Sequence, residues 1–318
     1  MQTMQISVDL RPDEADRIAD DSLAALEKRM LALVRSGEER DCAASCQAVA
    51  AATYHLGSGG QRVRGRLALH SGRCLGLPKK DSQALAAASE LIHNASLVHD
   101  DLHDRDTQRR GQPTVWYQFG DDVAICAGDL LLSASYLALS QFDGVARLPE
   151  LFALMHSRVA SAIRGQCAEL RQPLPAAHSI DDYKRIALAK SGALLSLPTE
   201  LVLLASGHSY ALSQARQAAA SFAIAYQIYD DLLDVEKDAA RSAVRHEGGS
   251  QSDDTSACNL VLILQADPTC ANARSAAVKI GVQHLLQAAT SSGNLPLHSG
   301  GALNELATQL LEKLRQLE

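Results

Sequence analysis

The residues with the clearest chemical potential are three aspartates, Asp100, Asp101 and Asp104, in the stretch 89–113. Apolar residues recur every three or four positions through this stretch, which predicts a helix with one buried face. Asp100 and Asp104 are four residues apart and so lie one above the other, and His93 shares their side two turns earlier. Carboxylates this close repel each other, so the folded state needs cations nearby or a proton on one of them.

The same spacing recurs in the segment 226–238, where Asp230, Asp231 and Asp234 follow Gln227. One such cluster could be a solvated acidic helix end, but two copies, each inside an apolar run, favour a shared site. Carboxylate oxygens suit Mg²⁺, which keeps several waters and bridges protein carboxylates to substrate phosphates. The sequence therefore predicts a magnesium site and a substrate that carries a diphosphate.

Basic residues accompany the first acidic cluster. Arg109 and Arg110 follow it directly, and a glycine-rich turn at 56–67 carries Arg64 into the next predicted helix. A guanidinium group matches phosphate oxygens with two parallel hydrogen bonds, and exposed amides at a helix start also attract anions. A solvated basic turn is the alternative, but beside two metal-type clusters we favour anion binding.

Lys190 lies in an otherwise apolar, small-residue segment, 181–201, and Ser191 and Gly192 follow it. A helix could kink there and direct polar groups inward. The alternative is a surface lysine that extends its ammonium group to solvent.

The composition predicts an all-α protein. Hydrophobic residues make up 47% of the 318 residues and aromatic residues only 4%, and Ala and Leu, which favour helices, lead the hydrophobic set. No linker divides the chain, so we expect one helical domain, 1–318, with a core large enough for a deep cavity. The polar, aperiodic segment 239–258 is expected to be a mobile loop. The expected helices cover 13–36, 40–55, 80–106, 122–142, 147–171, 181–201, 211–237, 256–266, 270–290 and 300–317.

Charge and hydropathy exclude several classes of protein. The net charge is −7 without a basic run, which argues against nucleic acid as a partner. No apolar run is expected to approach the roughly 20 residues that span a bilayer, and the first residues lack the pattern of a signal peptide, which favours the cytoplasm. The seven cysteines include no CxxC pair and are expected to be reduced and mostly buried.

Six segments resemble the trans-isoprenyl diphosphate synthases, in that family's order, between roughly residues 50 and 240. The first and second aspartate-rich motifs of the family are similar to SLVHDDLHDRDTQRRGQPT and YQIYDDLLDVEKD. Its GGKRxRP segment is similar to GSGGQRVRG, and its histidine, GD and Lys-Thr/Ser segments are similar to LIHN, AGDLLL and KSGALLS. The resemblance implies a helical bundle around a central cavity, usually a homodimer, with isopentenyl diphosphate and an allylic diphosphate as substrates.

The resemblance also implies roles for individual residues. Three Mg²⁺ ions are expected when substrate is bound, held by Asp100, Asp104 and Asp230 with Asp101, Asp231 and Asp234 in support. Arg109, Lys190, Ser191 and Gln227 would line the allylic diphosphate. Arg64, His93 and Arg110 would bind the diphosphate of isopentenyl diphosphate.

The sequence departs from the family pattern at two places. Gln61 replaces a lysine and Gly65 a proline in the GGKRxRP segment, and the loop after the second motif, RHEGGSQSDD, lacks a lysine. The loss of a charge at Gln61 keeps one alternative open, a class I terpene cyclase or allylic diphosphate hydrolase. A second alternative is a non-catalytic regulatory subunit, against which the intact aspartates argue. Small residues at Ala95 and Ser96, before Asp100, favour geranylgeranyl diphosphate as the product, with farnesyl diphosphate next.

Overall fold

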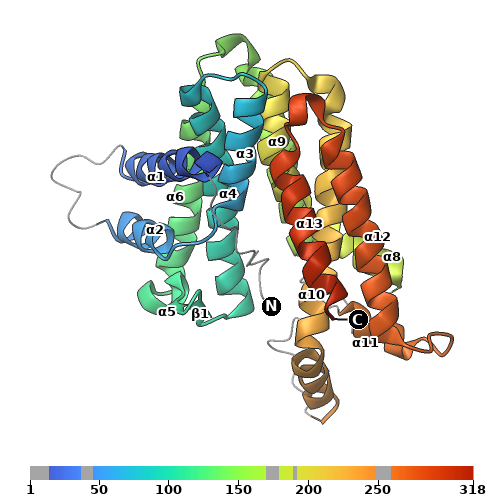
Figure 1. Cartoon of the computed structure of the whole chain (residues 1–318). Helices are drawn as coiled ribbons and strands as arrows, with labels where there is room; N and C mark the ends of the chain where they lie inside the picture. Colours follow the sequence, from blue (N-terminus) through green and yellow to red (C-terminus); the bar gives the residue numbers. More distant parts are fainter. Residues whose placement is uncertain (1–13, 37–45, 170–178, 189–191, 248–258, 318) are drawn as a thin grey trace.

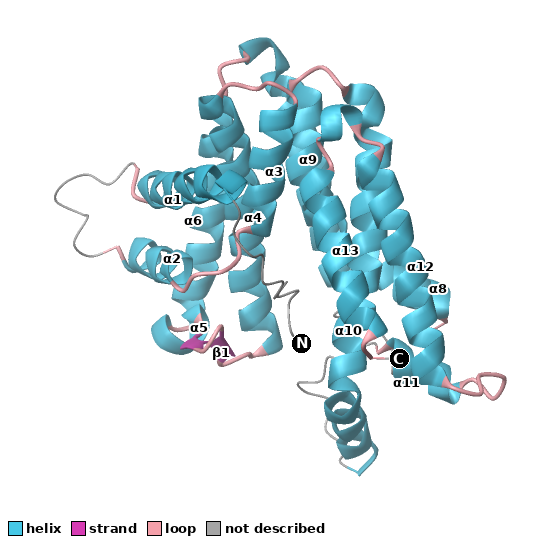
Figure 2. Cartoon of the chain, in the orientation of Figure 1, coloured by secondary structure: helices cyan, strands magenta, loops and turns pink. Residues whose placement is uncertain are grey.

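The computed structural model describes residues 14–36, 46–169, 179–188, 192–247 and 259–317. The described part is almost entirely helical, so the all-α prediction is confirmed (Figures 1 and 2). The exception within these ranges is a hairpin of two-residue strands, β1 (Gln108–Arg109) and β2 (Gln112–Pro113). Its turn uses Arg110 and Gly111, both with positive φ, as tight two-residue hairpins require.

The helices follow the predicted order with adjusted ends. The predicted helix 40–55 is described from Gln47 onward, and the predicted helix 181–201 is two helices on either side of residues 188–192. The α-helices are α1 (Glu14–Val34), α2 (Gln47–Gly57), α3 (Val63–Cys74), α4 (Lys79–Asp104), α5 (Val115–Phe119), α6 (Asp121–Ser140), α7 (Leu148–Glu169), α8 (Ile180–Ala187), α9 (Ala193–Ala205), α10 (Leu212–Glu247), α11 (Leu260–Ala266), α12 (Ala273–Gly293) and α13 (Gly301–Arg315).

Two groups of helices are joined by α3 and α9. In the first group α4 packs against α6, α3 and α1 (Figure 1). In the second group α10 packs against α12 and α11. Helix α9 contacts both α4 and α10. The first group buries residues such as Leu91 and Leu131, and the second buries Phe222 and Leu285. Because α3 and α9 contribute side chains to both cores, they fix α4 relative to α10. The single-domain organisation stays a prediction.

The predicted loop 239–258 is wrong in its first half, because α10 continues as a helix to Glu247. The segment AARSAVRHE contains three alanines, two arginines and one glutamate, and their helix propensity outweighs the polar, aperiodic pattern on which the loop was predicted. Residues 248–258 lie outside the described part of the chain.

Helix α6 corrects the expectation about apolar runs. It is the one described helix that is long and apolar enough to cross a membrane by length and composition, with 20 residues. Within the fold it packs against α4, α2 and α5, as a core helix does. The acidic residues at its start and Asp129 in its middle had divided the run in the sequence.

The cysteines are less buried than predicted. Cys46, Cys126 and Cys167 are exposed, and Cys74 and Cys270 are half-buried. All five are free thiols, so the predicted reduced state holds for the described cysteines. Cys42 and Cys258 lie outside the described residues.

Candidate functional site

The first acidic cluster occupies the end of α4. This helix ends at Asp104, and Arg105 follows with a left-handed backbone, φ 55°. Asp100 and Asp101 are buried and Asp104 is half-buried. Carboxylates in the last turn of a helix meet the negative end of its dipole, which is electrostatically unfavourable. This arrangement therefore favours a site that receives cations over a solvated helix end.

Asp101 forms an ion pair with Arg109 of the hairpin that follows α4. Arg109 Nε donates to both carboxylate oxygens of Asp101, at 2.8 and 2.9 Å, and Arg109 Nη2 donates as well. Burial raises the pKa of Asp101, and the hydrogen bonds from Arg109 oppose that rise. The pair ties the β1–β2 hairpin to α4, so both residues hold the loop that carries Arg110. Arg109 was also predicted to line a diphosphate. Its ion pair with Asp101 does not test that role, which stays a prediction.

The three residues predicted to bind one diphosphate lie in one neighbourhood. Arg64, in the first turn of α3, is 3.0 Å from His93 Nε2 through NH1. Arg110 donates to the backbone oxygen of Gly59, and a Cβ atom on Gly60 would lie 2.6 Å from its guanidinium carbon. The glycine-rich turn therefore lets Arg110 approach the backbone closely.

Burial and mutual repulsion set the charges of this arginine cluster. Burial lowers the pKa of Arg64 to about 10, and nearby Glu90 opposes the shift. Burial also lowers the pKa of Arg110 to about 10, helped by Arg62 and Arg109. The pKa of His93 falls well below its usual value through burial and the charge of Arg64, so its imidazole is neutral and can accept from Arg64. Positive charge is thus concentrated and poorly solvated, which suits an anion.

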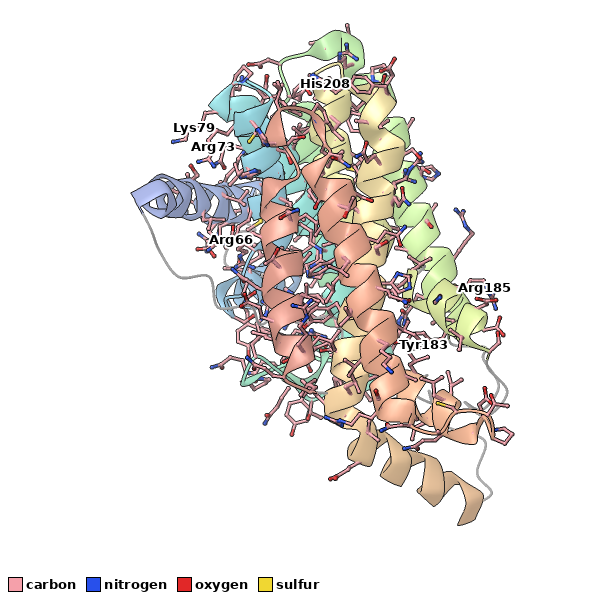
Figure 3. All side chains as sticks on the ribbon, turned by 45° about the vertical axis from the view of Figure 1, so that its right-hand side comes forward. Arg66, Arg73, Lys79, Tyr183, Arg185 and His208 are labelled. Atoms are coloured by element: carbon pink, nitrogen blue, oxygen red, sulfur yellow. The ribbon has the colours of Figure 1, made fainter. Side chains whose placement is uncertain are left out.

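The other arginines of α3 have different surroundings. In Figure 3 Arg73 lies near Lys79, and Arg66 lies lower on the same edge of the molecule. Arg62 is buried and donates to Glu27, at 3.0 Å, and to the backbone oxygen of Leu56. Its place beside Arg110 makes Arg62, rather than Arg66, the arginine that adds to the charge of the cluster.

Two buried polar residues of this site were missed by the sequence analysis. His55 on α2 is 4% exposed, and burial together with Arg110 lowers its pKa to about 3. Glu90 on α4 is 2% exposed and influences both Arg64 and Arg110. Neither belongs to a motif with chemical spacing, so only the packing of α2, α3 and α4 places them beside the arginines.

The second acidic cluster lies in the middle of α10. Burial and repulsion from Asp231 and Asp234 raise the pKa of Asp230 to about 8, opposed by a hydrogen bond with Tyr226. Asp231 is paired differently, because it accepts from the backbone N–H of Leu260, at 2.8 Å, and from Gln227, at 2.9 Å. Asp231 therefore ties α10 to the start of α11.

A chain of neighbouring groups connects the two helices that carry the acidic clusters. His93 on α4 contacts Arg64 on α3, the charge of Arg64 is influenced by Tyr226 on α10, and Tyr226 hydrogen-bonds Asp230. Within the described ranges, however, no three His, Cys, Asp or Glu side chains are grouped so that they could hold a metal ion. Each cluster alone is therefore an incomplete site for a metal.

The donor set nevertheless fits Mg²⁺. Burial and the neighbouring carboxylates of Asp231 and Asp234 raise the pKa of Asp230, and hard carboxylate oxygens of this kind are what Mg²⁺ binds. Because Mg²⁺ is bound by a few carboxylates together with substrate phosphates, the missing ligands would come from a diphosphate.

Lys190 and Ser191 lie outside the described residues, so their predicted roles stay predictions. The flanking residues Leu188 and Gly192 have π-helical geometry.

The chain is similar to known proteins over most of its length. The family model described as Polyprenyl synthetase matches residues 47–270. A farnesyl diphosphate synthase of Haemophilus influenzae is 35% identical over 195 residues, which are 59% of this chain and 66% of that protein. A short chain isoprenyl diphosphate synthase of Methanothermobacter thermautotrophicus is 30% identical over 189 residues, which are 59% of this chain and 58% of that protein. The matches thus cover less than two thirds of these relatives.

Solved structures share the fold at lower identity. A geranylgeranyl pyrophosphate synthetase from Geoglobus acetivorans has a TM-score of 0.73 and 23% identity, covering 93% of this chain and 99% of that one. A geranylgeranyl pyrophosphate synthetase from Pyrococcus horikoshii has a TM-score of 0.74 and 22% identity, covering 94% and 99%. At these identities the likeness extends to the fold alone.

Proposed function

Because this chain belongs to the polyprenyl synthetase family, we propose that it is a trans-prenyltransferase that condenses an allylic diphosphate with isopentenyl diphosphate. The observation that carries the proposal is the cluster of buried Arg64 and His93 with half-buried Arg110 beside the acidic end of α4. The cluster offers an anion site, and the two aspartate motifs offer ligands for divalent cations. The relatives named above are synthases of farnesyl diphosphate and of short chain isoprenyl diphosphate, which supports a diphosphate ligand here.

The proposed reaction breaks the allylic C–O bond and releases its diphosphate. The double bond of isopentenyl diphosphate attacks the allylic carbon to form the new C–C bond, and the adduct loses a proton, which the released diphosphate can accept. Arg64 and Arg110 hold the isopentenyl diphosphate, and neutral His93 orients Arg64. Fixed positive groups meet negative charge that develops on the leaving diphosphate, so the protein need not reorganise during the step.

Mg²⁺ would be held by Asp100, Asp104 and Asp230, with Asp234 in support. When bound it supplies Lewis-acid stabilisation of the departing diphosphate and orients it. Asp101 and Asp231 contribute by positioning the hairpin and α11. Three ions are proposed with substrate bound, as the family resemblance implies.

The experiment incubates the purified chain with Mg²⁺, isopentenyl diphosphate and either dimethylallyl, geranyl or farnesyl diphosphate. We expect prenyl diphosphate products that form only when both substrates are present. Consumption of the allylic diphosphate alone would instead identify a terpene cyclase or hydrolase, the alternative that Gln61 raises. Inactivity with all three primers would refute the transferase and favour a regulatory subunit.

Product length is proposed to be geranylgeranyl, with farnesyl next, and Ala95 provides its test. Ala95 is buried on α4 about one turn before Asp100, and its small side chain leaves room for a growing tail. Ala95→Phe is expected to shorten the product by at least one isoprene unit in mass spectrometry. Ala153→Phe, at an exposed position of α7, is the control and should leave the product unchanged. An unchanged product in Ala95→Phe would place the tail elsewhere, with Leu132 or Tyr136 as the next candidates for its limit.

A homodimer is proposed for the assembled enzyme, in the cytoplasm. The dimer is supported by exposed apolar side chains on α6, where Ile125 is 47% and Leu137 is 39% exposed. Sedimentation of the wild type is expected to give the mass of a dimer, and Leu137→Glu should shift it toward the monomer. A monomeric wild type would refute the proposed homodimer and its interface on α6.

A further inference from the structure

The proposed chemistry leaves unused a buried carboxylate beside the arginine cluster. Glu90 lies on α4, one turn before His93 and Asn94, and is 2% exposed. Its Oε1 accepts the backbone N–H of Gly65 at 3.0 Å, and its Oε2 accepts Asn94 Nδ2 at 3.4 Å. Both carboxylate oxygens therefore act as acceptors. A buried carboxylate is costly unless its hydrogen bonds and charge are matched, so this placement requires an explanation.

The charge of Glu90 is matched by the arginines of the site. Glu90 stabilises the charged forms of Arg64 and Arg110, which burial and their mutual repulsion disfavour. Arg64 depends on this support, because its Nε has no hydrogen-bond partner among the described residues and its NH1 contacts only a neutral imidazole, that of His93. Without Glu90 the guanidinium would lose a carboxylate charge that favours its buried position.

Glu90 also fixes the backbone next to Arg64. Gly65 donates the hydrogen bond, and a proline at this position, as in the family segment that GSGGQRVRG resembles, could not donate. A Cβ atom on Gly65 would overlap Leu26 of α1 and lie 3.2 Å from Glu90 Cγ. Gly65 thus provides both the N–H group and the space that let α3 approach Glu90.

We infer that Glu90 is a positioning residue for diphosphate binding: its carboxylate holds the Arg64 guanidinium by charge and the adjacent backbone by the Gly65 hydrogen bond. The inference deepens the proposed function and rests on it for the identity of the ligand, isopentenyl diphosphate. Glu90 itself does not contact the ligand, so its effect passes through Arg64.

The test compares Glu90→Gln with a matched control, Glu200→Gln. Glu200 on α9 is also fully buried and accepts from Arg158 and Ser196, away from the site. In Glu90→Gln the amide replaces one acceptor by a donor and removes the charge, so either the Gly65 or the Asn94 contact is lost. We expect the Kd for isopentenyl diphosphate, from calorimetry, to rise at least tenfold in Glu90→Gln and less than twofold in Glu200→Gln. KM for isopentenyl diphosphate should rise equally, with kcat and the KM for the allylic substrate within about threefold of wild type.

A double-mutant cycle separates positioning from a general loss of structure. If Glu90 acts through Arg64, Glu90→Gln should have no further effect on Kd in an Arg64→Gln background. Additive effects, or equal binding by Glu90→Gln and Glu200→Gln, would overturn the inference. Binding does not require turnover, so a wild type that binds isopentenyl diphosphate without making product would refute the proposed function while leaving this comparison valid. If the wild type does not bind isopentenyl diphosphate at all, Glu90 has no such ligand to position and the inference fails too.

Discussion

Replacing Asp230 by asparagine is expected to lower prenyl transfer by roughly a hundred- to a thousandfold, the loss seen when a group that stabilises transition-state charge is removed. The same change is expected to stabilise the free protein at high pH. Burial, Asp231 and Asp234 hold the pKa of Asp230 at about 8, so its charged form is disfavoured in the folded state. Asparagine keeps the size of the side chain and removes that charge.

The direction of the pH effect follows from this raised pKa. Between about pH 4 and pH 8 the folded state keeps a proton on Asp230 that the unfolded chain, with a pKa near 4, has released. The contribution of Asp230 to stability is therefore most favourable below pH 4 and is lost as the pH rises to 8. When the pH is raised from 6 to 9 in EDTA, the melting temperature of the wild type should therefore fall further than that of Asp230→Asn. Added Mg²⁺ with pyrophosphate should restore part of the loss in the wild type only.

Asp122→Asn is the matched control, because Asp122 is an exposed aspartate at the start of α6 with no proposed role. It should keep its activity and follow the wild-type pH profile. An Asp230→Asn variant that retains activity would remove Asp230 from the site. One that melts with the wild-type pH dependence would show that the carboxylates of α10 are not crowded.

Replacing Arg109 by alanine is expected to have the largest effect on stability. Its guanidinium forms a buried, two-pronged ion pair with Asp101, and its removal leaves that carboxylate buried without its partner. Breaking a buried pair in this way costs about 3–5 kcal/mol of unfolding free energy. Denaturant unfolding should measure this loss, and activity should fall as well, because the hairpin that carries Arg110 is no longer tied to α4.

Arg185→Ala provides the comparison for Arg109. Arg185 forms an exposed pair with Asp182 on α8, at 2.7 Å, and exposed pairs contribute about 0–1 kcal/mol. If Arg109→Ala loses no more unfolding free energy than Arg185→Ala does, the buried ion pair of Arg109 with Asp101 does not stabilise the fold as proposed. The double variant with Arg109→Ala and Asp101→Asn should recover part of the stability that Arg109→Ala loses, because it removes the unpaired charge.

The fold could be predicted from the sequence where local signals mark the helix ends. Gly76 and Pro78 precede α4, and Gly120 separates α5 from α6, so these boundaries were close to those observed. The end of α10 was not predicted, because AARSAVRHE combines good helix formers with a polar, aperiodic pattern, and the pattern was given more weight.

The candidate site was predictable only in part. The spacing of Asp100, Asp104 and Asp230 gives their helix faces directly, and Arg110 follows them in sequence. The pairing of Asp231 with the N–H of Leu260 depends on a contact 29 residues away, and no periodicity reveals it. Glu90 and His55 likewise become part of the site only through the packing of three helices, so a single sequence carries no signal for them.

The most direct test of a site shared by α4 and α10 counts the Mn²⁺ ions bound in the presence of pyrophosphate, by electron paramagnetic resonance, with Mn²⁺ in place of Mg²⁺. The wild type, Asp104→Asn on α4 and Asp234→Asn on α10 would be compared at equal concentrations. We expect the wild type to bind metal and pyrophosphate together. Each variant should bind fewer Mn²⁺ ions and have a lower affinity for pyrophosphate. If a variant in either motif leaves both quantities at wild-type values, the two aspartate motifs do not share one diphosphate.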